Sequence, residues 1–194
     1  MTGLNQLFHT RPVALVVVSG TVFLALSWLV SIGPALDLRT LSEAAARGQP
    51  AADPVIAQGR ALYLREGCGY CHSQFVRPTL IDLPFGRAST IADYATEQPP
   101  LAGTQRTGPD LSDVGSRQPS WIWQFMHLYN PRSMVEGSLM PSYPWYFEVV
   151  DAAAAQDEIH AIRLGPDFMP PGKAAIPTPE AVALVTYLRS LRQE

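Results

Sequence analysis

The stretch LREGCGYCHSQFVRP, residues 64–78, holds both cysteines of this 194-residue chain and places a histidine directly after the second one. Two cysteines are too few for a disulfide scaffold, so we expect their purpose to be local. Cys68, Cys71 and His72 follow the pattern C-x-x-C-H, the attachment motif for c-type haem. In that motif each thiol adds to one vinyl group of the porphyrin, and the histidine becomes the proximal ligand of the iron. The motif therefore predicts one covalently attached haem c.

Three other interpretations of the two cysteines are weaker. A zinc ribbon needs four ligands, commonly from two separated C-x-x-C pairs, and the chain has no third cysteine. A thioredoxin-type redox pair needs a βαβ setting, which no pattern in the chain indicates. A structural disulfide between Cys68 and Cys71 leaves His72 without a purpose. Haem c is the interpretation that uses all three residues.

Three segments of the chain beyond residue 50 carry helix signals. Two of them, at Asp53-Pro54 and Thr178-Pro179, open with a capping side chain followed by proline at the first helical position. No segment alternates apolar and polar residues over the length of a strand. We therefore expect an all-α domain with long loops. The expected helices begin at Pro54, near Ser120 and at Pro179, and the loop-rich stretches are 73–118 and 131–177.

Residues 13–32, VALVVVSGTVFLALSWLVSI, run for twenty positions without a charge. At about 1.5 Å per residue they span about 30 Å, the hydrocarbon thickness of a bilayer. A cleaved signal peptide is disfavoured because the run is too long and no A-x-A site follows it. A buried core helix of this length would carry polar interruptions. We expect a single membrane anchor, bounded by Arg11 and Pro12 before the run and by Gly33, Pro34, Asp37 and Arg39 after it.

The domain organisation follows from the anchor and from the polar, Ala-rich segment after it. We expect a tail and anchor over 1–36, a linker over 37–54 and a cytochrome domain over 55–194. Arginines flank both ends of the anchor, so the positive-inside count does not orient it. Because haem c is attached on the outer side of energy-transducing membranes, we expect residues 37–194 in the periplasm and the anchor in a bacterial inner membrane.

The charge composition argues against one class of partner. The net charge is −3 and the chain has a single lysine, Lys173. A protein that binds DNA or RNA normally presents a basic face. We expect no nucleic acid as a partner.

A low-spin haem needs a sixth ligand, and methionine or histidine can supply it. Met140 is the favoured residue, because it lies in the loop SLMPSYPW after the aromatic helix and Pro141 fixes the turn behind it. Met169, in FMPPG, is the second candidate, because proline follows it as well. Met126 and His127 lie in an aromatic-rich helix where core packing is the usual fate of such residues. His160 lies in a polar stretch. The complete set of candidates is Met126, Met134, Met140, Met169, His127 and His160.

Two further groups could support a haem. A ligating imidazole usually donates its other N–H to a fixed acceptor, and the carbonyl of Pro109 in RTGPDL is our candidate for His72. The alternative is that Gly-Pro-Asp forms an ordinary turn. Haem propionates need donors, and we select Arg77 and Arg132 as candidates. The arginines available for this role are Arg77, Arg106, Arg117 and Arg132.

Four phrases, YLREGCGYCHSQFVRP, RTGPDL, HLYNPR and MPSYPW, follow one anchor helix in this order. Together they closely resemble the mono-haem cytochrome c subunit (subunit II) of cbb3-type cytochrome c oxidases, and the similarity covers most of the chain. The resemblance implies Cys68 and Cys71 as thioether sites, His72 as the proximal ligand and Met140 as the distal ligand. The loop from Thr79 to Leu101 and the stretch from Val149 to Pro177 depart from the family pattern.

The resemblance also implies a class I cytochrome c fold, in which a helix over 54–66 crosses a helix over 179–192. The crossing is expected between Gly59 and Tyr63 on one helix and Tyr187 and Leu188 on the other.

The function implied by the resemblance is electron relay inside an oxidase. The chain would accept electrons from another cytochrome c and pass them to the haem b and copper subunit, which reduces oxygen to water and pumps protons. The expected partners are that catalytic subunit, other oxidase subunits, the donor cytochrome c and membrane lipid; the chain itself is not expected to be catalytic. Two alternatives are the cytochrome c subunit of a nitric oxide reductase and a free, membrane-anchored electron shuttle.

Overall fold

A computed structural model describes residues 10–46, 53–94, 97, 99–103 and 105–193 of the chain. The chain divides into two units, Met1–Gln49 and Pro50–Glu194. Each unit is described by itself below.

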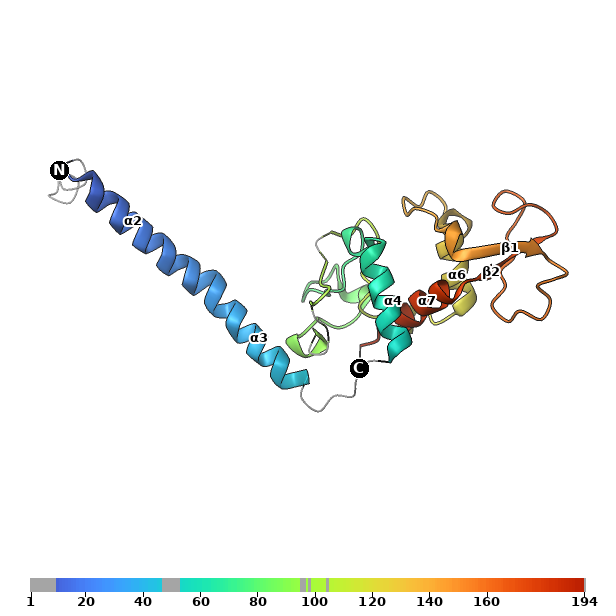
Figure 1. Cartoon of the computed structure of the whole chain (residues 1–194), viewed down its shortest axis with the longest axis horizontal. Coiled ribbons are helices and arrows are strands. Elements are labelled where there is room, and N and C mark those ends of the chain that lie inside the picture. Colours follow the sequence, from blue (N-terminus) through green and yellow to red (C-terminus); the bar gives the residue numbers. More distant parts are fainter. Residues whose placement is uncertain (1–9, 47–52, 95–96, 98, 104, 194) are drawn as a thin grey trace. The chain divides into compact units, whose positions relative to one another are not determined.

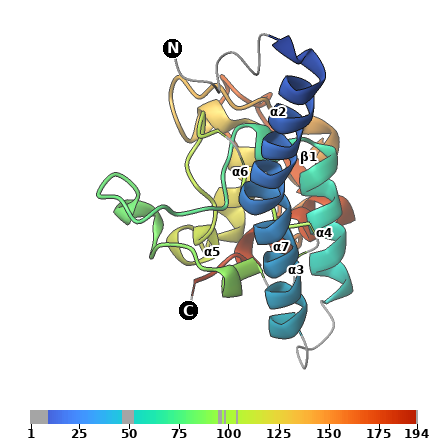
Figure 2. The same ribbon diagram turned by 90° about the vertical axis from the view of Figure 1, so that its left-hand side faces the viewer.

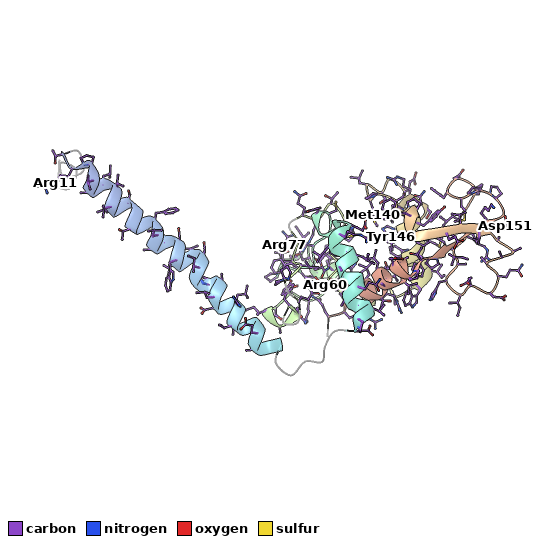
Figure 3. All side chains as sticks on the ribbon, viewed as in Figure 1. Arg11, Arg60, Arg77, Met140, Tyr146 and Asp151 are labelled. Carbon is purple, nitrogen blue, oxygen red and sulfur yellow. The ribbon has the colours of Figure 1, made fainter. Side chains whose placement is uncertain are left out.

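The first unit is one unbroken helix composed of α2 (Pro12–Ser27), a π-helical segment η1 (Trp28–Ile32) and α3 (Gly33–Ala46) (Figure 1). Its stretch Pro12–Leu41, 30 residues long, is apolar enough to cross a membrane by length and composition. Side chains project from it on all sides (Figure 3), and none of its most apolar window is buried. Apolar residues without any covering surface are what a bilayer-spanning helix requires.

The helix does not end at Gly33 and Pro34, which corrects the expectation drawn from those two residues. Pro34 has no N–H and cannot make the usual helical bond to Val30. The chain absorbs this defect with a π-turn, in which the N–H of Gly33 donates to the carbonyl of Trp28 five residues earlier. Helix α3 therefore continues into the predicted linker as far as Ala46, and residues 47–52 lie outside the described residues.

The second unit contains three main helices whose starts are the predicted ones. The Asp53 carboxylate accepts the Val55 N–H at 2.7 Å, and the hydroxyls of Ser120 and Thr178 cap their helices in the same way. Short 3₁₀ segments connect the helices. The helices are α4 (Pro54–Arg65), α5 (Val114–Arg117), α6 (Trp121–Tyr129) and α7 (Pro179–Ser190). The 3₁₀ segments are η2 (Cys68–Tyr70), η3 (Leu83–Phe85), η4 (Ile91–Tyr94), η5 (Pro131–Ser133) and η6 (Pro144–Tyr146).

Helices α4 and α7 pack against each other at the centre of the second unit (Figures 1 and 2), as the resemblance implied. A Cβ on Gly59 would lie 2.0 Å from the carbonyl oxygen of Ala183 and 2.7 Å from the Cβ of Tyr187. Only glycine permits so close an approach of the two backbones. One turn further along α4, the rings of Tyr63 and Tyr187 meet edge to face with centroids 5.5 Å apart.

A small antiparallel sheet corrects the all-α expectation for this unit. Strand β1 (Phe147–Asp151) pairs with β2 (Lys173–Pro177), with Phe147 opposite Pro177 and Asp151 opposite Lys173. The strands have five residues each and lie over 20 positions apart in sequence, and KAAIP has no apolar–polar alternation. Such pairing is set by tertiary contact, which periodicity in the sequence does not report.

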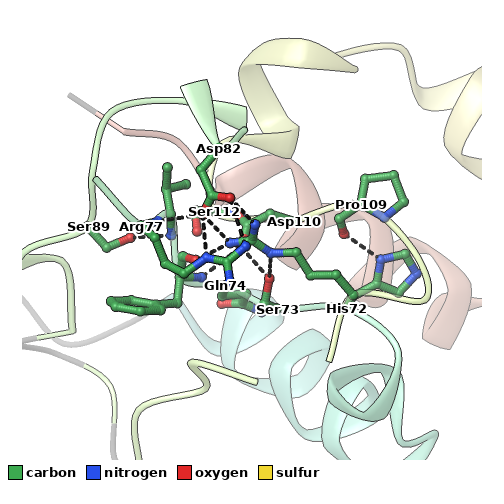
Figure 4. Close-up of polar contacts among 12 residues, drawn as sticks. His72, Ser73, Gln74, Arg77, Asp82, Ser89, Pro109, Asp110 and Ser112 are labelled. Atoms are coloured by element: carbon green, nitrogen blue, oxygen red, sulfur yellow. Dashed lines mark hydrogen bonds and ion pairs between the residues drawn. The ribbon is translucent and has the colours of Figure 1, made fainter. Parts of the chain in front are cut away.

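The long loop after α4 is held by two buried aspartates (Figure 4). Asp82 is fully buried and accepts hydrogen bonds from the Arg77 N–H at 2.7 Å, from Arg77 Nε at 3.0 Å and from Arg106 NH1 at 2.5 Å. Hydrogen bonds from Arg106, and then from Arg77, hold the pKa of the Asp82 carboxyl far below its usual range. Asp110, also fully buried, accepts from the Ser73 hydroxyl at 2.6 Å and from the Phe75 N–H at 2.8 Å.

We predict that Asp82→Asn destabilises the second unit in a pH-dependent way. A carboxyl whose pKa is depressed on folding stabilises the fold above its unfolded pKa of about 3.9, and this stability is lost as the pH falls toward the folded pKa. The urea midpoint of the variant should lie below that of the parent at pH 7, and the gap should narrow below about pH 4.

The matched control is Asp151→Asn, which breaks the pair to Lys173, because the Asp151 side chain is 77% exposed. It should change the midpoint little, since exposed ion pairs contribute little to stability. An equal gap for Asp82→Asn at pH 7 and at pH 3 would contradict the prediction.

Candidate functional site

The C-x-x-C-H segment forms a tight turn at the end of α4. Gly67 adopts a left-handed φ of 70°, and a Cβ there would meet the Tyr70 ring at 2.8 Å. Left-handed backbone ends the helix and lets the chain reverse into η2. The N–H groups of Cys71 and His72 then both donate to the carbonyl of Cys68, at 3.2 and 3.0 Å. This winding brings the first thiol and the imidazole to the same side of the chain.

Cys68 and His72 open onto a cavity of about 690 Å³, part of which is open to solvent. Its side walls are apolar and come from Leu111, Val114, Leu184 and Leu188. A concave, mainly apolar space with a few polar groups is the usual form of a cofactor site. Helix α7 therefore contributes both to the packing against α4 and to the cavity wall.

The imidazole of His72 is held from behind by the backbone of RTGPDL. Its Nδ1–H donates to the carbonyl of Pro109 at 2.7 Å (Figure 4), which leaves Nε2 available. The approach requires Gly108, because a Cβ there would lie 2.2 Å from Cε1 of His72. Burial lowers the pKa of His72, with the Pro109 bond opposing this effect. The ring is therefore favoured in its neutral form, the form that binds metals.

The surroundings of the Cys68 thiol disfavour its thiolate form, which bears on whether the motif is a redox pair. Burial raises its pKa to about 12, and the nearby Glu66 adds to the effect. Redox-active thiols have lowered pKa values instead. Cys68 and Cys71 are not bonded to each other, and Cys71 is exposed. Within the described residues, no group of three or more His, Cys, Asp and Glu side chains is placed to hold a metal ion.

The candidates for a sixth ligand separate clearly in the structure. Met140 lines the cavity together with His72, whereas Met169 is 2% exposed, belongs to the hydrophobic core and does not line the cavity. Met126 also packs against the core, and His160 stacks on Trp121 with ring centroids 4.9 Å apart. The cavity is not lined by Met126, Met134 or His160.

Helix α6 supplies two further cavity residues: Trp123, which the sequence analysis did not name, and His127, a ligand candidate that it had assigned to core packing. His127 and Trp123, four positions apart, line the cavity and stack with ring centroids 4.7 Å apart. Burial lowers the pKa of His127 to about 4, with the charge of His72 as a second cause. The spacing of four positions puts both residues on one face of the helix, and this spacing could have indicated from the sequence that they share the cavity wall. The aromatic composition of α6 had instead suggested core packing for His127.

Among the four arginines named as candidate propionate donors, Arg117 is the one that lines the cavity. Its guanidinium donates to the Asp110 carbonyl and lies over the Phe85 ring. Arg106 is engaged with Asp82. Arg77 pairs with Asp82 and Arg132 is exposed, and neither of these two lines the cavity.

The donor set suits the group that the motif implies. An imidazole with a free Nε2, a thioether and a half-buried thiol border one apolar cavity, and a c-type haem uses these three groups. The set is contributed by two separate segments, the turn after α4 and the loop after η5, and the RTGPDL loop supplies the carbonyl that orients His72.

Two comparisons with known proteins bear on this site. The family model for the cytochrome c oxidase mono-haem subunit, FixO, matches residues 5–168. A search of curated proteins found no match to the chain. The family match covers most of the chain and includes the C-x-x-C-H turn, Pro109 and Met140. The chain therefore belongs to the FixO family of mono-haem cytochrome c oxidase subunits, the family that its sequence resembled.

Proposed function

We propose that this chain is a membrane-anchored cytochrome c with one haem c, attached through thioether bonds to Cys68 and Cys71. His72 and Met140 would hold the haem iron, and residues 55–194 would form a class I cytochrome c domain. The observation that carries the proposal is that Cys68, His72 and Met140 border one apolar cavity while Pro109 fixes His72 from behind.

The bound haem supplies one-electron redox chemistry, and the residues of this chain set its potential. Pro109 holds the proton of His72 on Nδ1, so that Nε2 is the basic nitrogen. The thioether of Met140 raises the potential relative to a second imidazole. Leu111, Val114, Leu184 and Leu188 line the cavity with apolar side chains, and apolar surroundings would disfavour the more highly charged oxidised state.

The proposed role is electron relay from a cytochrome c donor to the haem b and copper subunit of a cbb3-type oxidase. Membership of an oxidase subunit family supports this role and implies other oxidase subunits as partners. The helix Pro12–Leu41 supports a single-pass anchor. We place the anchor in a bacterial inner membrane and the haem domain in the periplasm, where haem c is attached. Oxygen reduction and proton pumping belong to the complex.

The relay role predicts that the chain co-purifies with haem b and copper from mild detergent, and that the complex oxidises reduced cytochrome c with oxygen as acceptor. The measurement is a subunit analysis with an optical spectrum and an oxygen-uptake assay. Nitric oxide consumption without oxygen uptake would favour a nitric oxide reductase. A chain that purifies alone as a monomer would favour a free electron shuttle.

The ligand assignment predicts that Met140→Ala abolishes the methionine-to-iron absorption band. It should also lower the potential by about 0.1 V or more, because axial ligands move haem potentials over a range of about 0.8 V. Met169→Ala and His127→Leu are the controls and should keep the band. Loss of the band in either control, with retention in Met140→Ala, would move the ligand to that residue.

The close contact of Gly108 with the His72 ring predicts that Gly108→Ala impairs haem incorporation. The added Cβ would force the imidazole away from its position against Pro109. Loss of such a supporting contact costs on the order of 10-fold in metal-site affinity or activity. Covalent haem per polypeptide, measured by haem staining on a denaturing gel, should fall. Gly165→Ala is the matched control, since a Cβ there meets nothing within 4 Å, and it should stain like the parent.

A further inference from the structure

Three large apolar side chains project from the loop between Val76 and Ser89. Leu80 is 85% exposed, Ile81 is 80% exposed and Leu83 is 64% exposed. The loop extends from the body of its domain as the green segment at the left of Figure 2. Single exposed leucines are normal on a protein surface. Three within four positions, at the tip of a projecting loop, form a local apolar patch.

The loop is built as a rigid support for this patch. Val76 and Ser89 close its base, because the Ser89 N–H donates to the Val76 carbonyl and the Val76 N–H donates to the Ser89 hydroxyl. At the tip, the Asp82 N–H donates to the Thr79 carbonyl at 3.0 Å. This bond closes a turn whose two central residues are Leu80 and Ile81, so both side chains point outward from it.

The buried carboxylate of Asp82 holds the turn in place through its ion pairs. The fully buried Asp82 lies beside Leu80 and Ile81 in sequence and is clamped by Arg77 and Arg106. The backbone that carries these two exposed side chains is therefore held in place. A contact element that is ordered before it binds loses little conformational entropy on binding.

The charges near the tip are paired, which suits contact with an apolar phase. Arg77 pairs with Asp82, and Arg87 pairs with Asp93 at the base of the loop. An unpaired carboxylate beside the tip would have to give up its hydration on entering a membrane, at a high cost. Arginine can extend its charged end toward the polar headgroups while its carbon chain lies against apolar surface.

The covalent structure keeps this domain at a membrane. Helix α3 ends at Ala46 and α4 begins at Pro54, so seven residues separate the helices and the eight Cα–Cα steps between them span at most about 29 Å. With Pro12–Leu41 in a bilayer, the domain experiences that surface at a high effective concentration. At a high effective concentration, a patch of two or three apolar side chains needs little affinity of its own to contact that surface.

We propose that the turn Thr79–Asp82 inserts Leu80 and Ile81 into the interfacial region of the lipid bilayer that the anchor spans. The domain is then tied to the membrane at two points, the anchor and the turn. The inference rests on the proposed membrane anchorage and does not depend on the haem.

The test uses the full-length chain in vesicles of phosphatidylcholine and phosphatidylglycerol. Ile81→Cys is labelled with an environment-sensitive fluorophore, and emission is recorded with and without spin-labelled lipid as a quencher. Ile159→Cys is the matched control, because Ile159 is 84% exposed in the same domain. The parent chain, treated in parallel, reports any reaction of Cys68 and Cys71. Vesicle flotation of the parent tests the anchorage separately.

The proposal expects a blue-shifted, lipid-quenched label at position 81 and a water-like, unquenched label at position 159. Adding Leu80→Ser should reduce the quenching at position 81 at least twofold. Equal quenching at both positions would overturn the proposal, because the contact would not be specific to the turn.

Two other outcomes also overturn it. A label at position 81 that stays water-like in vesicles and shifts only when the other oxidase subunits are present would assign the turn to a protein contact. A label that stays water-like in both settings would leave the turn in solvent. If the parent chain fails to float with the vesicles, the proposed anchorage fails as well, which separates that failure from a failure of the turn alone.

Discussion

The close approach of α4 and α7 at Gly59 is the constraint on which the rest of the second unit depends. With no Cβ at Gly59, the carbonyl of Ala183 can lie against α4. The same crossing puts Leu184 and Leu188 of α7 beside the turn that follows α4, where Cys68 and His72 lie. The packing of two helices distant in sequence therefore also builds one wall of the cavity. A larger residue at Gly59 would disturb both.

The site is stabilised by a second pairing of distant segments, 71–75 with 108–112. The Gly108 N–H donates to the Cys71 carbonyl, and the Leu111 N–H donates to the Ser73 carbonyl. Asp110 adds bonds to Ser73 and Phe75. Pro109 therefore meets His72 as part of a continuous set of contacts, not as an isolated turn. The buried Asp82 extends the support through Arg106, which also donates to the Ser73 hydroxyl.

The parts of the structure that were predicted depend on contacts between neighbours in sequence. The helix starts at Pro54 and Pro179 follow from a capping side chain and a proline that act within one turn. The parts that were not predicted depend on distant partners. Strands β1 and β2 are too short to show a period, and the helix continues past Pro34 because a π-turn replaces the missing bond. Pro34 does remove one helical hydrogen bond, as the local rule states, but the helix does not end there.

The sequence by itself determined the family, the C-x-x-C-H turn and an apolar helix long enough to span a bilayer, because each of these depends on residue types at short, fixed spacings. Met140 was already preferred to Met169 on sequence, but only the tertiary structure places the first at the cavity wall and the second in the core. Likewise, Arg117 instead of Arg77 or Arg132 reaches the cavity, and His127 joins its wall. Which of several similar side chains faces a shared space is decided by how distant segments pack, and no local pattern records that packing.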